Sequence, residues 1–242
     1  KQGGLGFAAL LFPILLLPGL LAISATVSIW LANRIGPTPG GWPELLSGID
    51  GFGITPGAAD GDAVGVAVAT GGRTSAVAEG DGAVSTMMSV HNAPYCAILE
   101  RYGSAAQKAE VLRPAASGEF IGAFALTESQ AGSDASALRT RAVRHGNDYV
   151  INGAKQFITS GKIGRYTIVF AVTDPANTKR GISAFLVPTD TTGYSVSKIE
   201  HKLGQKASDT ASLNFDALEV PVEARIGAEG EGYRIALSSL ET

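Results

Sequence analysis

The residues whose types could bind a ligand are small or hydroxyl-bearing. Most of them lie in or next to the segment SQAGSD, residues 129–134. Gly132 and Ser133 would let the backbone approach a pyrophosphate, and the Ser133 hydroxyl can donate to an anionic oxygen. Thr127 and Thr159 each stand at the end of an expected strand, where a short hydroxyl can donate a hydrogen bond to a ligand. Taken alone, Thr127 and Ser133 are more simply explained as ordinary strand-end and turn residues.

Other candidate sites have weaker support. His91 could serve as a ligand or a base, but no second histidine or carboxylate stands at metal-binding spacing, which favours a histidine satisfied within a helix. The single cysteine, Cys96, cannot form an internal disulfide, and no Cys/His cluster offers four ligands for structural zinc. The glycine-rich residues 61–82 contain neither a GxxxxGK[ST] loop nor a strand that feeds a GxGxxG motif into a helix. The lone cysteine fits a reducing compartment, so we expect a cytoplasmic location.

Composition excludes several classes of protein. The chain has 242 residues and a formal net charge of −3, which argues against a nucleic-acid-binding surface. Hydrophobic residues make up 45% and charged residues 17%, so the chain is not of the disordered, highly charged kind. Its length allows one or two domains with a substantial core.

The composition changes near residue 84, because 17 of the 31 glycines precede it. No charged residue lies between Lys1 and Arg34, and residues 7–32 are long and apolar enough to form a membrane-spanning helix. We therefore expect an apolar helix in residues 1–35, with membrane association open, followed by a Gly/Ala-rich linker or irregular region in residues 36–83.

Beyond residue 84 the pattern is first helical and then strand-like. Apolar spacing predicts short helices up to residue 119, with Ser104 as an N-cap. Asn152-Gly153 is typical of a two-residue hairpin turn, and the chain turns helical again at Gly232. The expected fold is α+β, with a short helical region before an antiparallel β-barrel-like domain. Period-two patterns predict seven strands, in EFIGAFAL, DYVIN, GAKQFITS, YTIVFAV, GISAFLVP, YSVSKI and ASLNFDALEVP.

Several segments occur in an order that matches one family. They are FALTESQAGSD from Phe124, INGAKQFITSG from Ile151, KLGQKASDTASLNFDALEVP from Lys202 and GEGYRIALSSLET from Gly230. On these segments, residues 84–242 resemble the acyl-CoA dehydrogenases. The resemblance implies the end of an N-terminal helical domain in residues 84–119, a β domain in residues 120–225, and the start of a C-terminal helical domain in residues 226–242.

The resemblance implies FAD-dependent α,β-dehydrogenation of an acyl-CoA thioester, as in fatty acid β-oxidation, with hydride transferred to flavin N5. Phe157 takes the place where many relatives carry Trp, and an aromatic ring there would pack against the flavin. Ser133 and Glu241 correspond to substrate contacts. The matching cofactor contacts are Phe124, Leu126, Thr127, Gly132, Ser133, Phe157, Ile158 and Thr159.

The resemblance also implies what this chain lacks. The family's catalytic Glu corresponds to positions beyond Thr242, and Glu241 is not that base, so we expect no catalytic residue here and an inactive fragment. Glu128 is the tempting substitute, but if Thr127 faces the flavin, the adjacent Glu128 faces away. Electron-transferring flavoprotein is the implied electron acceptor, and the complete protein is expected to be a homo-oligomer. A non-catalytic acyl-CoA-binding or flavin-binding module, tethered to a membrane through residues 7–32, remains the alternative.

Overall fold

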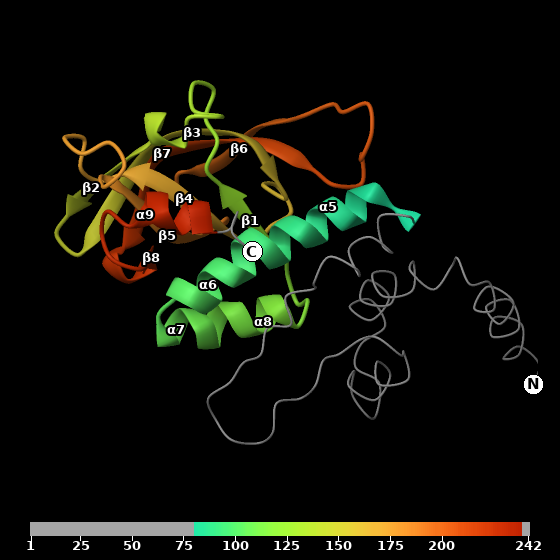
Figure 1. Cartoon of the computed structure of the whole chain (residues 1–242), viewed down its shortest axis with the longest axis horizontal. Coiled ribbons are helices and arrows are strands. Elements are labelled where there is room, and N and C mark those ends of the chain that lie inside the picture. The colour runs from blue at the N-terminus through green and yellow to red at the C-terminus, as the bar shows by residue number, and fades with distance from the viewer. Residues whose placement is uncertain (1–79, 239–242) are drawn as a thin grey trace, which may run out of the picture. The chain divides into compact units, whose positions relative to one another are not determined.

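The computed structural model describes residues 80–238 (Figure 1). The expectations for residues 1–35, for nearly all of residues 36–83 and for Glu241 lie outside the described residues. The chain divides after Ser85, and the fold described below is that of the unit that begins at Thr86. Between residues 80 and 238, no helix has the length and apolar character needed to cross a bilayer.

Two helical runs precede the sheet. The first comprises α5 (Gly82–Val90), a π-helical turn η2 (His91–Cys96) and α6 (Ala97–Tyr102). The second comprises α7 (Ala105–Gln107), η3 (Lys108–Leu112) and α8 (Arg113–Ala116). Ser104 caps the second run as expected, because its hydroxyl accepts from Gln107 N while the Gln107 side chain accepts from Ser104 N.

His91 connects the helices to the sheet. Its Nδ1 accepts from Gly122 N at 3.0 Å, so the ring proton lies on Nε2, which donates to the carbonyl of Ala115 at 3.1 Å. Burial lowers the pKa of His91, which keeps the imidazole neutral. This satisfied, neutral ring confirms the structural interpretation of His91.

Eight strands form one sheet in the described region. The order is β6-β7-β3-β2-β4-β5-β8, and β1 pairs with β4 beside this path. Only the β1–β4 and β2–β4 pairs are parallel, so the expected mostly antiparallel domain is confirmed, but the sheet is not closed into a barrel. The strands are β1 (Gly122–Ala125), β2 (Arg141–His145), β3 (Asp148–Thr159), β4 (Tyr166–Val172), β5 (Ile182–Pro188), β6 (Tyr194–Ile199), β7 (Thr210–Pro221) and β8 (Arg225–Ile226).

The hairpin predicted at Asn152-Gly153 is wrong, because β3 runs straight through both residues. The Asn152 side chain instead accepts from Ala217 N, which stabilises a bulge on β7 where Ala217 has a φ of 48°. Gly153 is required for close approach, since a Cβ there would lie 2.7 Å from Thr140 Cα. The two-residue loop that does connect antiparallel strands is Gly146-Asn147, between β2 and β3, with Gly146 at a φ of 65°.

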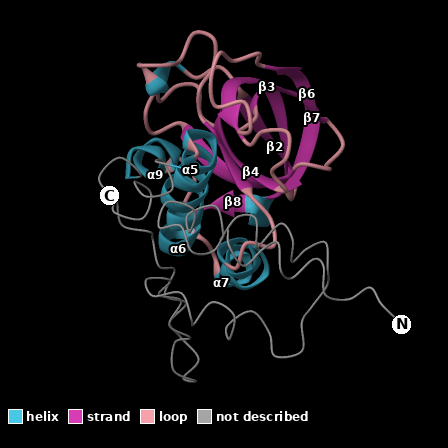
Figure 2. Cartoon of the chain, turned by 90° about the vertical axis from the view of Figure 1, so that its right-hand side faces the viewer, coloured by secondary structure: helices cyan, strands magenta, loops and turns pink. Residues whose placement is uncertain are grey.

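The sheet curves around an apolar core, and helices α6, α7 and α9 (Gly232–Ser238) lie to one side of it (Figure 2). Helix α9 begins at the residue predicted from the sequence. Short 3₁₀ turns occur at η4 (Ala135–Ala137) and η5 (Val222–Ala224). Inward-facing residues of β3, β5 and β7, including Tyr149, Phe185 and Leu213, form the centre of the core.

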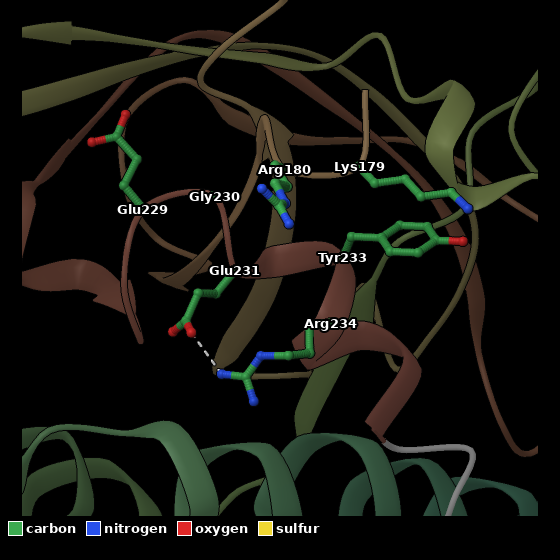
Figure 3. Close-up of a pocket in the computed structure, with 7 residues that line it drawn as sticks. All are labelled: Lys179, Arg180, Glu229, Gly230, Glu231, Tyr233 and Arg234. Atoms are coloured by element: carbon green, nitrogen blue, oxygen red, sulfur yellow. Dashed lines mark hydrogen bonds and ion pairs between the residues drawn. The ribbon is translucent and has the colours of Figure 1, made fainter. Parts of the chain in front are cut away.

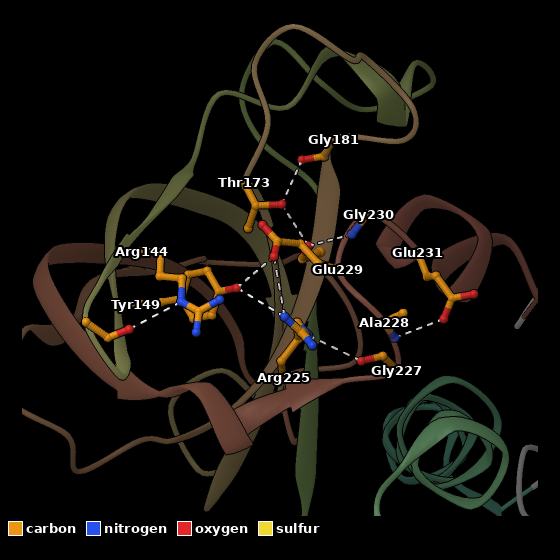
Figure 4. Close-up of polar contacts among 12 residues, drawn as sticks. Arg144, Tyr149, Thr173, Gly181, Arg225, Gly227, Ala228, Glu229, Gly230 and Glu231 are labelled. Carbon is orange, nitrogen blue, oxygen red and sulfur yellow. Dashed lines mark hydrogen bonds and ion pairs between the residues drawn. The ribbon is translucent and has the colours of Figure 1, made fainter.

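A polar cluster fixes the segment between β8 and α9 (Figure 4). The Tyr149 hydroxyl donates to Glu229 Oε2 at 3.1 Å and accepts from Arg225 Nη1 at 3.1 Å. Gly230 N donates to the Ser183 hydroxyl at 2.9 Å. The cluster therefore joins the start of α9 to β3 and β5.

A buried ion pair attaches the loop after β1 to β3. Lys155 Nζ lies 2.8 Å from Glu128 Oε1, and the two residues are only 1% and 5% exposed. The Glu128 carboxylate also accepts from Gln130 Nε2 at 2.6 Å, from Arg139 N at 2.7 Å and from Thr140 N at 3.1 Å. These four donors to one buried carboxylate join Glu128 to Gln130, to the backbone of residues 139 and 140, and to Lys155 on β3.

We therefore expect Glu128→Gln to lower the free energy of unfolding by about 3–5 kcal/mol, because it leaves the Lys155 ammonium buried without a counter-charge. Urea denaturation measures the change. Glu110→Gln is the control, since Glu110 is exposed and should shift the value by less than about 0.5 kcal/mol. Adding Lys155→Met to Glu128→Gln should recover part of the loss, and equal effects of Glu128→Gln and Glu110→Gln would contradict this role.

Candidate functional site

The most unusual backbone in the sheet lies at the end of β3. Lys155 pairs with Leu213 and Ile158 with Ala211, so Gln156 and Phe157 together face a single residue of β7. Phe157 has a φ of 60°, in the left-handed region that a bulky side chain rarely adopts, and is 57% exposed. An aromatic ring held outside the core on a strained bulge is typical of a binding site.

The bulge sets which side chains share a face with Phe157. Ile158 and its partner Ala211 both point into the core. Thr159 and its partner Thr210 therefore lie on the outer face, as does the exposed Phe157. The Thr159 hydroxyl is half-buried and forms no hydrogen bond within residues 80–238.

The segment after β1 lies beside this bulge. Gln156 N donates to the carbonyl of Thr127 at 2.9 Å, and Lys155 Nζ donates to the carbonyl of Leu126 at 3.0 Å. The Thr127 hydroxyl, like that of Thr159, has no partner within the described part of the chain. The structure thus brings Leu126 and Thr127 next to Phe157, although about thirty residues separate them along the chain.

The other residues predicted to contact a cofactor do not all project beside Phe157. Gly132 and Ser133 are exposed beyond a tight turn closed by Glu128 and Ala131, and a Cβ at Gly132 would meet no atom within 4 Å. No hydrogen bond in the described region links Ser133 to the threonines. Phe124 packs edge-on against Phe170 at 5.0 Å, and the Ile158 side chain belongs to the core, so neither projects freely beside Phe157.

Glu128 is unsuited to act as a base. Burial by itself would raise its pKa, but the Lys155 ammonium and the hydrogen bonds from Lys155, Arg139 N and Thr140 outweigh burial and hold the pKa of Glu128 below its ordinary value. Burial lowers the pKa of Lys155 to about 8. A carboxylate with a low pKa and four donors is a poor proton acceptor.

The predicted site does not include Lys155, because a lysine beside a turn is usually solvated at the surface. The signal was present, because Lys155 is in phase with Tyr149 and Ile151 on the buried face of one strand. The bulge also had a signal. The two buried positions Lys155 and Ile158 stand three residues apart, which breaks the period of two at Phe157.

Two surface pockets lie away from these residues. One, of about 380 Å³, is lined by the loop before β5, by residues 229–231 and by the start of α9 (Figure 3). In it Lys179 Nζ lies 5.3 Å from the centre of the Tyr233 ring, while Arg234 Nη2 pairs with Glu231 Oε1 at 2.6 Å. The other, of about 390 Å³, is lined by residues that include Arg139, Arg141 and Asn177. No residue predicted to contact a cofactor lines either pocket.

In chemical terms, the site offers an exposed aromatic ring, an open glycine and two hydroxyls, on half-buried threonines, that have no partner in the described part of the chain. A flat heterocycle with polar atoms along one edge would match these groups, because the ring would stack on Phe157 while its edge bonds Thr127 and Thr159. A phosphate would fit near Gly132 and Ser133.

The strain at Phe157 gives a direct prediction. Phe157→Asn should raise the free energy of unfolding by about 1 kcal/mol, because Asn tolerates the left-handed region and the exposed Phe ring loses little packing. Ile163→Asn is the matched control: Ile163 is 52% exposed but has no positive φ, so no gain is expected. Thermal or urea unfolding of both variants measures the difference, and a loss at Phe157→Asn as large as at Ile163→Asn would exclude strain.

Comparison with known proteins identifies the family. The sequence profile of the acyl-CoA dehydrogenase middle domain matches residues 123–218, and that of the acyl-CoA dehydrogenase N-terminal domain matches residues 49–119. A short-chain specific acyl-CoA dehydrogenase of Clostridium acetobutylicum is 42% identical over 160 residues, which are 66% of this chain and 42% of that protein.

Solved structures agree with the sequence matches. A chain in a structure of the electron transferring flavoprotein of Acidaminococcus fermentans is 40% identical with a TM-score of 0.69, over 70% of this chain and 44% of that one. A glutaryl-CoA dehydrogenase of Mycobacterium smegmatis, in complex with FADH2, is 38% identical with a TM-score of 0.64, over 70% of this chain and 42% of that one. The chain thus spans less than half the length of these relatives. This chain belongs to the acyl-CoA dehydrogenase family.

Proposed function

We propose that this chain supplies the flavin-contacting part of an FAD-dependent acyl-CoA dehydrogenase, which removes hydrogen from the α and β carbons of an acyl-CoA thioester. The observation that carries the proposal is Phe157, held exposed on a strained bulge near Thr127 and Thr159, whose hydroxyls have no hydrogen-bond partner within residues 80–238. The matched glutaryl-CoA dehydrogenase, solved with FADH2, supports the choice of cofactor.

Each residue has a role in holding the cofactor. Phe157 would stack on the flavin ring, while Thr127 and Thr159 would donate to its polar edge. Gly132 leaves room for the pyrophosphate, to which the Ser133 hydroxyl would donate. When bound, the flavin supplies the acceptor for the substrate hydride. Phe124 and Ile158 would then support the site from behind, since their side chains pack elsewhere.

The base that removes the α proton would come from outside the described residues. Glu128 is excluded by its buried ion pair and its lowered pKa. A positioned carboxylate must reach the substrate within about 3 Å or through one water, and the family resemblance puts that residue beyond Thr242. Residues 120–225 would thus form the flavin-binding domain, and residues 226–242 the entry to the domain that carries the base.

The substrate and the electron acceptor follow from the same proposal. Acyl-CoA is the proposed substrate, with Ser133 and Glu241 as contacts, although Glu241 lies outside the described residues. An electron-transferring flavoprotein is the proposed acceptor, supported by the structural match to a chain in such a protein's structure. The complete enzyme is proposed to be a homo-oligomer that acts in fatty acid β-oxidation.

Cofactor binding is measured by titrating FAD into the purified chain and following the flavin absorbance after gel filtration. We expect saturable binding, and we expect Thr159→Val to weaken it about threefold to tenfold, because one hydrogen bond to the ring is lost. Thr192→Val is the control, since Thr192 is exposed on the loop before β6. Binding of an acyl-CoA without FAD would instead favour a non-catalytic acyl-CoA-binding module.

The FAD-loaded chain alone should not reduce an acceptor dye when acyl-CoA substrates of several lengths are added. Loss of a positioned base typically removes about 10²–10⁴-fold of rate. Retention of the flavin absorbance controls for folding during the assay. Recovery of turnover on adding the C-terminal helices of a relative in trans would support the assignment, whereas turnover by the chain alone would show that a base lies within it.

A further inference from the structure

A lysine that has no place in the site described so far lies close to it. Lys202 Nζ donates to the Thr210 hydroxyl at 2.9 Å and to the carbonyl of Ser208 at 2.5 Å. Thr210 is the direct cross-strand partner of Thr159, and both point to the outer face of the sheet. Directly paired side chains have Cβ atoms about 5 Å apart, so the Lys202 ammonium lies near the Thr159 hydroxyl.

The Lys202 ammonium forms no direct ion pair within the described residues. No carboxylate oxygen of residues 80–238 lies within 4.0 Å of Lys202 Nζ. The nearby Glu200 pairs with Lys198 at 2.7 Å. Asp209 stands between the two residues that Lys202 contacts; its Oδ2 accepts from the backbone Lys162 N at 2.8 Å, and its buried Oδ1 has no hydrogen-bond partner within residues 80–238. An ammonium carries three donors, of which Ser208 and Thr210 use two, so one N–H is left for a ligand.

The local backbone holds Lys202 in this position. Glu200 N donates to the carbonyl of Thr210 at 2.8 Å, which extends the β6–β7 pairing to the residues just before Lys202. Gln205, in the same loop, has a φ of 53° and accepts from the Thr86 hydroxyl at 2.9 Å. The loop that carries Lys202 is thus attached at Glu200 and at Gln205, and Lys202 itself is half-buried.

We propose that the Lys202 ammonium lies at the edge of the flavin ring that Thr159 contacts, where its charge favours the reduced ring over the oxidised one. The inference rests on the proposed function. Uptake of a hydride adds two electrons and one proton to a neutral oxidised ring and leaves it with one negative charge. A cation at the ring edge therefore stabilises the reduced state more than the oxidised state.

The test compares three substitutions of Lys202 in the FAD-loaded chain. Lys202→Met removes the charge and the donor, Lys202→Gln keeps a donor to Thr210 but no charge, and Lys202→Arg keeps the charge. Lys206→Met is the control, because Lys206 is exposed in the same loop. Each protein is reduced slowly with dithionite beside a reference dye of known potential, and the absorbance gives the ratio of reduced to oxidised flavin.

At a fixed potential we expect this ratio to fall about tenfold in Lys202→Met and Lys202→Gln, which corresponds to about 30 mV for a two-electron couple. Lys202→Arg and Lys206→Met should stay close to the unsubstituted chain. If Lys202→Met does not fold, the Gln and Arg variants still separate charge from hydrogen bonding.

Two outcomes would overturn the inference in different ways. The charge of Lys202 does not act on the flavin if the ratio of reduced to oxidised flavin is unchanged in both Lys202→Met and Lys202→Gln. The same holds if Lys202→Gln alone has the ratio of the unsubstituted chain. Either result would leave the proposed function intact. An unsubstituted chain that binds no FAD would refute the proposed function and this inference with it.

Discussion

The arrangement of the candidate site depends on one buried carboxylate. Glu128 collects donors from Lys155, Gln130 and the backbone of residues 139 and 140, and so fixes a loop that has no regular structure of its own. Within residues 80–238, Thr127 itself is joined to the bulge of β3 by one backbone hydrogen bond, from Gln156 N, and the contacts of Glu128 hold the loop that follows it. The pairing also removes Glu128 from acid–base chemistry, because the same contacts that position it lower its pKa.

A second constraint acts on the sheet itself. Both neighbours of β7 carry an extra residue near Ser212: Phe157 and Gln156 oppose it on β3, and Ser197 is inserted on β6. Such bulges bend a sheet and re-aim its side chains. Here the bulge on β3 places Phe157 and Thr159 on the same outer face. The strain at Phe157 is therefore part of how the surface is built, and stability and ligand contact are expected to oppose each other there.

The sequence predicted features that depend on local chemistry. The Ser104 cap and the start of α9 follow from short-range patterns, and the mostly antiparallel sheet follows from the period of two. Features set by distant contacts were missed. Asn152-Gly153 has the composition of a turn, but Thr140 and the β7 bulge, far away along the chain, decide its conformation. Lys155 was left out because surface lysines beside a turn are usually solvated, and its partner Glu128 comes close only when the loop after β1 folds back. The family motifs supplied Thr127 and Thr159, which local chemistry alone did not distinguish from ordinary strand ends.

The most direct test of this account is a crystal structure of the chain grown with FAD. We predict that the flavin ring lies against Phe157 on the outer face of β3, with the hydroxyls of Thr127 and Thr159 within hydrogen-bond distance of its polar edge and the pyrophosphate near Gly132 and Ser133. A flavin bound instead in the pocket of Lys179 and Tyr233, or one that leaves both threonine hydroxyls in solvent, would contradict the account.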